Sequence, residues 1–204
     1  MNILQVGTNS GNDHVLKFCK HLSKNNINKL LLVEPFSIHN PQIELNYKGF
    51  DYNLFNIAIV PNKNQEKITF YFHEKDVDGR RDGTPAYEVA SINIDHIIKH
   101  YGNDRSLIRS FNVPCITLNE FIENNLKNMK LDYLYLDIEG IDMEVIMSLN
   151  LNKYDIENII IEILHLDKEK LISYMSNYKY HPVDDSSFDN YIQKGYDLLF
   201  KKKL

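Results

Sequence analysis

The feature that most constrains this chain is the alternation of short apolar runs with segments of helical periodicity. Strands that alternate with helices predict a mainly parallel sheet with helices packed on both faces, an α/β fold. The apolar runs that read as strands of this pattern are 2–6, 29–35, 55–60, 113–118, 132–138 and 158–164. The segments with helical spacing are 15–25, 43–48, 93–101, 119–126, 142–150 and 168–175.

Two further segments predict antiparallel structure. Residues 68–72, ITFYF, combine aromatic and β-branched side chains and predict an antiparallel ribbon or an edge strand. Residues 178–183 and 196–202 predict an antiparallel pair that closes the sheet near the C-terminus.

Residues 73–112 interrupt the alternation with a polar stretch rich in turn signals. Because the βα pattern resumes afterwards, we interpret this stretch as an insertion into a single domain, 1–204, that forms a lid or a substrate wall. Arg80 and Arg81, in its most polar part, either bind a phosphate or carboxylate of a substrate or are free surface charges.

Composition excludes several classes of protein. The 204 residues suffice for one domain with a substantial core, and the net charge of −5 argues against a nucleic-acid partner. Cys19 and Cys115 are isolated and do not form a disulfide framework. No apolar run is long enough to span a bilayer and no secretory leader is recognisable, so we expect a cytoplasmic protein.

Right-handed crossovers bring the carboxyl ends of parallel strands to one edge of the sheet, where ligands bind. The first such end is GTNSGN, 7–12, in which Gly7 and Gly11 permit a tight turn and the following helix offers free N–H groups. The glycine spacing matches neither GxGxxG nor a P-loop, and a plain turn is the alternative.

The second strand ends in Glu34-Pro35. A carboxylate here can accept hydrogen bonds from both ribose hydroxyls, although a solvated or helix-capping acid is an equal alternative for Glu34 alone. Together with the glycine loop it predicts a nucleoside site. Asn56 and Ala58 would then lie near the base, with strand packing as the simpler account of Ala58.

The stretch LDIEGID places three acids, Asp137, Glu139 and Asp142, where an apolar strand becomes a helix. Alternation along the strand predicts that Asp137 and Glu139 point the same way, where their repulsion requires a cation or a shared proton. They bind a metal or cationic group, or act as base and orienter. Alternatively, Asp142 is an N-cap and Glu139 is solvated, which leaves Asp137 unexplained.

Glu162 and His165 end the next strand at the same edge. The carboxylates of Asp137, Glu139 and Glu162, with or without His165, could hold Mg²⁺ or Mn²⁺. His165 could equally be a general base or have a structural role.

These motifs together resemble the FkbM-type methyltransferases, which use S-adenosyl-L-methionine and have the class I, Rossmann-like fold. The resemblance extends from about Asn2 to His165, and Asn119 and Asp142 stand where the family commonly has Asp and Glu. The segments that carry it are GTNSGN, VEP, NIAIV, VPCITLNEFI, YLDIEGIDMEVI and IIIEI.

The resemblance implies methylation of a hydroxyl oxygen on a sugar, a glycan or a polyketide-derived small molecule. It implies that Asp137 lies near the amino-acid end of the cofactor and that Glu139 faces the substrate. His165 or Glu139 would be the base, with His96 and His100 as further candidates unless they occupy a solvated helix face. The residues expected to contact the cofactor are Gln5, Gly7, Thr8, Asn9, Ser10, Gly11, Glu34, Pro35, Asn56, Ala58 and Asp137.

Gln5 is a departure from the family, which usually has Asp two residues before the first glycine. Gln5 cannot neutralise the ammonium group of the cofactor, which predicts weaker binding. Gln5 therefore favours one alternative, a non-enzymatic interaction protein on a decayed methyltransferase scaffold. The glycine loop and the acid after the second strand leave open another, an NAD-dependent oxidoreductase or epimerase.

Overall fold

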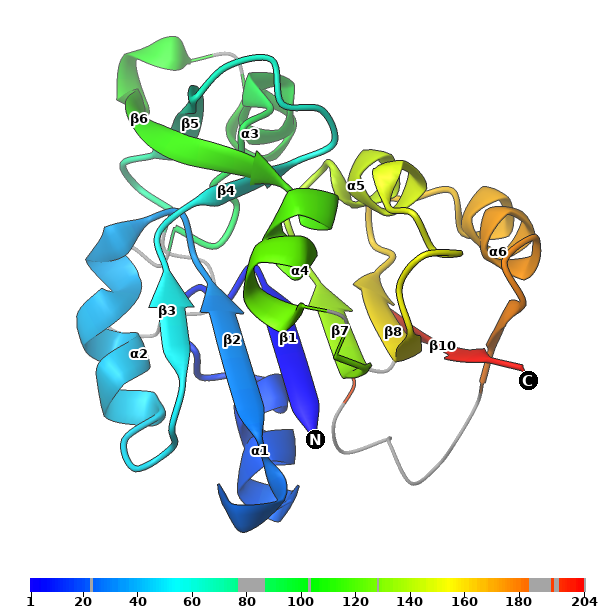
Figure 1. Cartoon of the computed structure of the whole chain (residues 1–204). Coiled ribbons are helices and arrows are strands. Elements are labelled where there is room, and N and C mark those ends of the chain that lie inside the picture. Colours follow the sequence, from blue (N-terminus) through cyan, green and yellow to red (C-terminus); the bar gives the residue numbers. More distant parts are fainter. Residues whose placement is uncertain are drawn as a thin grey trace.

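A computed structural model describes residues 1–22, 24–76, 87–102, 104–127, 129–183, 192 and 195–203. Figure 1 shows a large sheet flanked by helices and a small sheet that lies across one end of it. Arg80 and Arg81 are outside the described residues.

The large sheet has seven strands in the order β3-β2-β1-β7-β8-β10-β9, all parallel except β10, which is antiparallel to both of its neighbours. This confirms the predicted Rossmann-like fold, mainly parallel with an antiparallel strand near the C-terminus. The predicted pairing of the last two strands is also confirmed. The strands are β1 (Asn2–Val6), β2 (Lys29–Val33), β3 (Asn53–Phe55), β7 (Leu131–Leu136), β8 (Ile156–Glu162), β9 (Tyr180–Pro182) and β10 (Asp197–Lys202).

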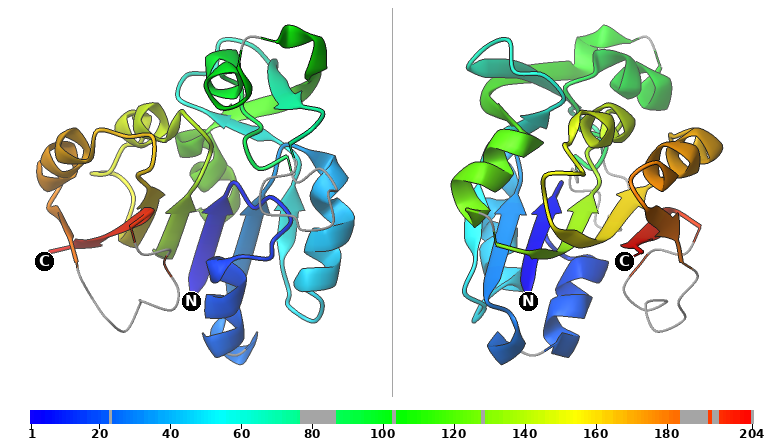
Figure 2. Two further views of the ribbon diagram at one scale, coloured as in Figure 1. Left: turned by 180° about the vertical axis from the view of Figure 1, so that it is seen from behind. Right: turned by 45° about the vertical axis from the view of Figure 1, so that its right-hand side comes forward.

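The described helices are α1 (His14–Leu22), α2 (Asn40–Asn46), α3 (Ile94–Tyr101), α4 (Leu118–Leu126), α5 (Asp142–Ser148) and α6 (Lys168–Ser176), with 3-10 turns at Lys24–Asn26, Ser37–His39 and Arg105–Leu107. Figure 2 shows α1 and α2 on one face of the large sheet and α4, α5 and α6 on the other. None of the described helices combines the length and the apolar character that crossing a lipid bilayer requires.

Two apolar cores result, one on each face, because successive strand residues point to opposite sides of a sheet. In β1, Leu4 and Val6 pack under α4 and α5, whereas Ile3 packs under α1 and α2. Strands buried on both faces explain why the sequence shows continuous apolar runs instead of alternation.

The small sheet has the order β4-β6-β5 and is formed by β4 (Ala58–Val60), β5 (Lys67–His73) and β6 (Ile108–Thr117). The prediction of one strand over 55–60 is wrong, because β3 ends at Phe55 and β4 belongs to the other sheet. Residues 113–118 likewise supply β6 and the start of α4, and not a strand of the large sheet. The antiparallel pairing predicted for 68–72 is confirmed.

Long-range pairing explains these errors. Ala58–Val60 pair with Cys115–Thr117, more than fifty positions away, and an apolar run does not reveal which sheet it joins. Together with α3, the small sheet lies over the carboxyl ends of the large sheet's parallel strands (Figure 1).

The chain passes from the small sheet to the large one through a capping box at the start of α4. Thr117 Oγ1 accepts a hydrogen bond from the Glu120 N–H at 3.2 Å, and the Glu120 carboxylate accepts one from the Thr117 N–H at 3.1 Å. These reciprocal bonds satisfy two otherwise free donors and lower the pKa of Glu120.

We therefore expect Thr117→Ala to lower the free energy of unfolding by about 0.5–2 kcal/mol, the usual loss when an N-cap is removed. Thr117→Ser keeps the hydroxyl and is the matched control. Urea unfolding followed by circular dichroism measures both variants. Equal stability of the alanine and serine variants would contradict the role of the cap.

Candidate active site

A cavity of about 470 Å³ opens at the carboxyl edge of the parallel strands. This volume is within the range of about 300–1,000 Å³ that small-molecule sites occupy. The segments that follow β1, β2, β7 and β8 form most of its wall. The remaining side comes from Phe70 of β5, from residues 87–90 between β5 and α3, and from His100 of α3.

The loop after β1 lies at the centre of this wall. Gly7, Thr8, Asn9 and Ser10 line the cavity. Gly7 has φ +87°, and a Cβ at this position would lie 1.6 Å from the carbonyl oxygen of Asp137. Because only glycine permits that approach, the loop packs directly on the end of β7.

Gly11 faces away from the cavity. Its φ is +69°, and a Cβ there would lie 2.8 Å from Cε2 of Tyr47. Gly11 therefore shapes the loop. Unlike its neighbours Ser10 and Asn12, it is not among the residues that line the cavity.

Glu34 and Pro35 both line the cavity, one strand away from the glycine loop. The two carboxylate oxygens of Glu34 accept hydrogen bonds from backbone N–H groups, Oε1 from Phe36 and Oε2 from Asn9, each at 2.7 Å. Burial nevertheless raises the pKa of Glu34 to about 7. Each oxygen retains a lone pair for a ligand hydroxyl.

Asn56 and Ala58 are not among the residues that line the cavity. Asn56 Nδ2 donates to the Glu34 carbonyl oxygen at 2.8 Å and to Asn40 Oδ1 at 2.9 Å. Ala58 is 1% exposed and packs in the core of the small sheet. Asn56 therefore supports the backbone of Glu34. Ala58 packs in a core, which was the simpler of the two interpretations of the sequence.

Gln5 is buried behind the loop, where it borders a smaller cavity of about 90 Å³. Its Nε2 donates to Asp13 Oδ2 at 2.6 Å, and its Oε1 accepts from the Tyr47 hydroxyl at 3.1 Å. Asp13 borders both cavities, and its Oδ1 accepts from the Leu16 N–H at 2.9 Å at the start of α1. Asp13 is not among the site residues expected from the sequence, although an Asp directly before a helical pattern is a recognisable cap signal.

The carboxylates at the ends of β7 and β8 are crowded together. Asp137, Glu139 and Glu162 all line the cavity. Asp137 is exposed to solvent as a residue and lines the cavity, where neighbouring protein groups partly desolvate its carboxyl group. Loss of bulk water and the negative charges of Glu162 and Glu139 raise its pKa. Burial, reinforced by Glu139 and Asp142, raises the pKa of Glu162 to about 8.

Asp142 is not the N-cap that one interpretation of the sequence assigned to it. Ile141 occupies the cap position, and Asp142 is the first residue of α5. Its Oδ1 accepts from the Ile138 N–H at 2.9 Å, which closes the turn between β7 and α5. Burial raises the pKa of Asp142 to about 7.

Glu139 and Gly140 form that turn with positive φ values of +52° and +89°. The sequence predicted that strand alternation points Asp137 and Glu139 the same way. This reason is wrong, because β7 ends at Leu136, before either residue. The turn brings both to the cavity instead.

Two residues of the insertion, His96 and Ser91, contact Glu139. His96 Nε2 lies 2.9 Å from Glu139 Oε2, and the Ser91 hydroxyl donates to the Glu139 carbonyl oxygen at 2.6 Å. A Cβ on Gly140 would lie 2.7 Å from His96 Nδ1, so glycine is required beside this pair. The alternative of a solvated helix face is wrong for His96, which is 5% exposed. His100 is exposed, as that alternative expects, and also lies on the cavity wall.

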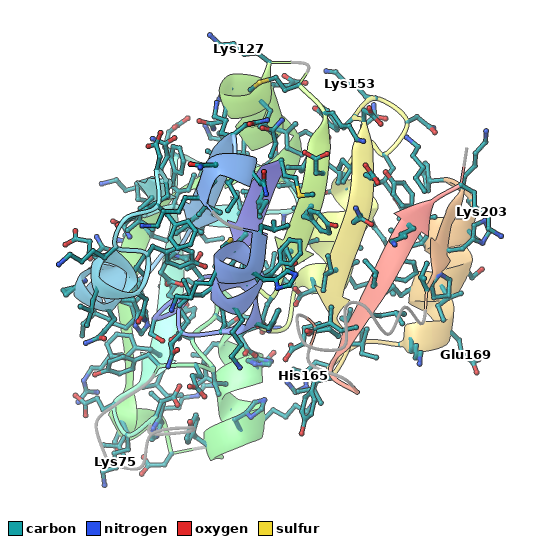
Figure 3. The ribbon with its side chains drawn as sticks, turned by 90° about the horizontal axis from the view of Figure 1, so that it is seen from below. Lys75, Lys127, Lys153, His165, Glu169 and Lys203 are labelled. Carbon is teal, nitrogen blue, oxygen red and sulfur yellow. The ribbon has the colours of Figure 1, made fainter. Side chains whose placement is uncertain are left out.

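His165 lies on the cavity wall at the end of β8. Figure 3 shows it at the opposite end of the sheet from Lys127 and Lys153, which precede β7 and β8. Burial and the neighbouring His96 lower the pKa of His165, which favours the neutral imidazole that can accept a proton.

Comparison with known families gives one consistent result. A family model described as the methyltransferase FkbM domain matches residues 5–182. This range includes the glycine loop, Glu34, the Asp137–Glu139 turn and His165. Comparisons with curated proteins and with solved structures gave no match.

The raised pKa values predict how stability depends on pH when no ligand is present. A carboxyl whose pKa is higher in the folded state than in the unfolded chain, where Glu is near 4.3, binds more protons when folded. With Glu34 and Asp142 near 7 and Glu162 near 8, the free energy of unfolding should fall as pH rises from 6.5 to 8.5. Urea unfolding at the two pH values measures this loss.

Glu162→Gln should reduce the loss, because one acid of the group no longer ionises. Glu169→Gln, an exposed change on α6, is the control and should leave the loss unchanged. Equal pH dependence in both variants would contradict the crowding of charge at the cavity.

Proposed function

The chain belongs to the FkbM methyltransferase family, and from this premise we propose that it is an S-adenosylmethionine-dependent O-methyltransferase acting on a hydroxyl of a sugar, a glycan or a related small molecule. The observation that carries the proposal is that Glu34 and Asp137 border one cavity, with the Gly7 loop between them. When bound, the cofactor supplies an electrophilic methyl group on a sulfonium cation.

The residues present suit the two ends of that cofactor. Glu34 would accept hydrogen bonds from the ribose hydroxyls, since its oxygens already face the loop and retain free lone pairs. Phe70, Tyr87 and Val89 add apolar surface to the same cavity.

Asp13 would supply the carboxylate that Gln5 lacks. The Gln5 amide donates a hydrogen bond of 2.6 Å to Asp13 Oδ2 at the boundary of both cavities, so an acidic side chain is present there although the usual position carries Gln. This arrangement favours a functional cofactor site over a decayed scaffold.

The acids and histidines on the opposite wall would serve the acceptor. Asp137 would attract the positive charge near the reacting sulfur, and Glu139 would orient the acceptor hydroxyl. His165 would accept the hydroxyl proton, because its lowered pKa keeps the imidazole neutral at physiological pH. The main demand on such a site is alignment of the attacking oxygen with the methyl group.

We also propose that the chain acts as one domain in which the small sheet and α3 form the substrate wall. Val89, Ala90 and His100 come from this part and border the same cavity as Glu34. The part of the insertion that the structure describes therefore lies where an acceptor would enter.

Glu34→Ala should weaken the binding of S-adenosylhomocysteine by about 1.5–3 kcal/mol, the loss expected for hydrogen bonds to a charged group. This corresponds to an increase in Kd of roughly tenfold to a hundredfold. Isothermal titration calorimetry measures it, with the exposed Glu44→Ala on α2 as control. Binding of NAD in place of S-adenosylhomocysteine, or no change in the Glu34 variant, would overturn the assignment.

Asp137→Asn should weaken the binding of S-adenosylmethionine more than that of S-adenosylhomocysteine, because only the former carries the sulfonium charge. The fold should persist, since the amide resembles the protonated carboxyl that the raised pKa favours. Titration with both ligands tests this, and the exposed Asp51→Asn is the control. An equal loss for both ligands would refute the role of Asp137 beside the sulfonium.

A further inference from the structure

Three histidines from two separate elements meet beside the cavity. His96 and His100 are four residues apart on α3 and therefore lie on one face of the helix, and His165 follows β8. The ring centroids are 4.7 Å apart for His96 and His100, 4.9 Å for His96 and His165, and 5.1 Å for His100 and His165.

The ligand nitrogens of these rings lie near one another, and modest side-chain rotations would bring them onto one ion. The ligand atoms of His96, His100 and His165 all lie within 4.8 Å of one another. Metal–nitrogen bonds of about 2.0–2.1 Å place two ligands of a tetrahedral ion about 3.4 Å apart, a distance that small side-chain rotations would reach.

Carboxylates adjoin the histidines. Glu139, Glu162 and His165 form a second group within 4.8 Å, so the two groups share His165. Glu139 Oε2 lies 2.9 Å from His96 Nε2, which links the groups a second time. The sequence suggested a ligand set of Asp137, Glu139 and Glu162. Among the described residues, Asp137 belongs to neither of the two groups.

His96 and Glu139 are held in place by their surroundings, whereas His165 is half-buried and His100 is exposed. Gly140 leaves room for the His96 ring, and the Ser91 hydroxyl fixes the backbone of Glu139. The His96 side chain is 4% exposed, and burial of this kind limits the rotamers that the ring can adopt. Supporting contacts of this type orient ligands in metal sites.

We propose that His96, His100 and His165, with Glu139 as a fourth ligand, bind a divalent first-row transition metal ion such as Zn²⁺ or Co²⁺. Imidazole nitrogens select such ions, whereas Mg²⁺ and Ca²⁺ prefer oxygen ligands. The positive ion also relieves repulsion among the carboxylates at the ends of β7 and β8.

An ion here borders the cavity, because His100, His165 and Glu139 line it. A hydroxyl group bound to such an ion loses its proton more readily. When the ion is bound, His165 is a ligand, and the ion in place of the His165 imidazole promotes loss of the hydroxyl proton. This role rests on the proposed methyl transfer, whereas the metal site itself does not.

Titration of the full, chelator-treated chain with Co²⁺ tests the site through the visible absorption of the bound ion. We expect saturation near one equivalent, displacement by Zn²⁺ and no displacement by Mg²⁺. His100→Gln and His165→Gln should each raise the Kd for Co²⁺ by about tenfold or more. His181→Gln, on β9, is the matched control and should bind as the unmodified chain does.

Thermal unfolding gives a second readout, since Co²⁺ should raise the Tm of the unmodified chain and of the His181 variant only. Circular dichroism in the presence of chelator shows whether each variant is folded. Equal Co²⁺ affinity in the unmodified chain and in a folded His100 or His165 variant would overturn the proposal. These measurements use no methyl donor, so their failure is separable from a failure to bind S-adenosylhomocysteine.

Discussion

The close approach of Gly7 to the carbonyl of Asp137 is the constraint on which the cavity depends. Hydrogen bonds join the three central strands at the same level: the Gly7 N–H donates to the Val33 carbonyl and the Asp137 N–H donates to the Val6 carbonyl, both at 3.0 Å. Because no Cβ separates the backbones at Gly7, the ends of β2, β1 and β7 meet at one edge. Glu34 and Asp137 therefore lie on opposite sides of the loop that contains Gly7.

This arrangement brings several carboxyl groups to one cavity, where their negative charges repel one another. At an effective dielectric near 20, two unit charges about 4 Å apart interact by about 4 kcal/mol before desolvation is counted. Without a cation, desolvation and the neighbouring negative charges raise the pKa values of Asp137 and Glu162. A cationic ligand converts the same repulsion into attraction, so the site is electrostatically suited to a sulfonium, an ammonium or a metal ion.

The segment between β5 and β6 borders the cavity and also contacts the turn that follows β7. His96 and Ser91 both bond to Glu139, so the insertion holds the turn that follows β7. The positive φ of Glu139 is a sparsely populated conformation for a residue other than glycine, and such backbone persists only where the surroundings stabilise it. The described part of the segment between β5 and β6 and the turn after β7 are therefore joined directly, through His96 and Ser91.

The sequence by itself determined the class of fold, since buried strands and amphipathic helices alternate with clear periodicity, and it determined which strand ends carry acids and glycines. Both are local properties that composition and spacing record. Only the tertiary structure decided that Ala58–Val60 join Cys115–Thr117 in a second sheet, that Gln5 holds Asp13, and that His96, His100 and His165 converge. These features depend on contacts between residues distant in the chain, and such contacts arise from the packing of whole elements and leave no periodic trace in any one of them.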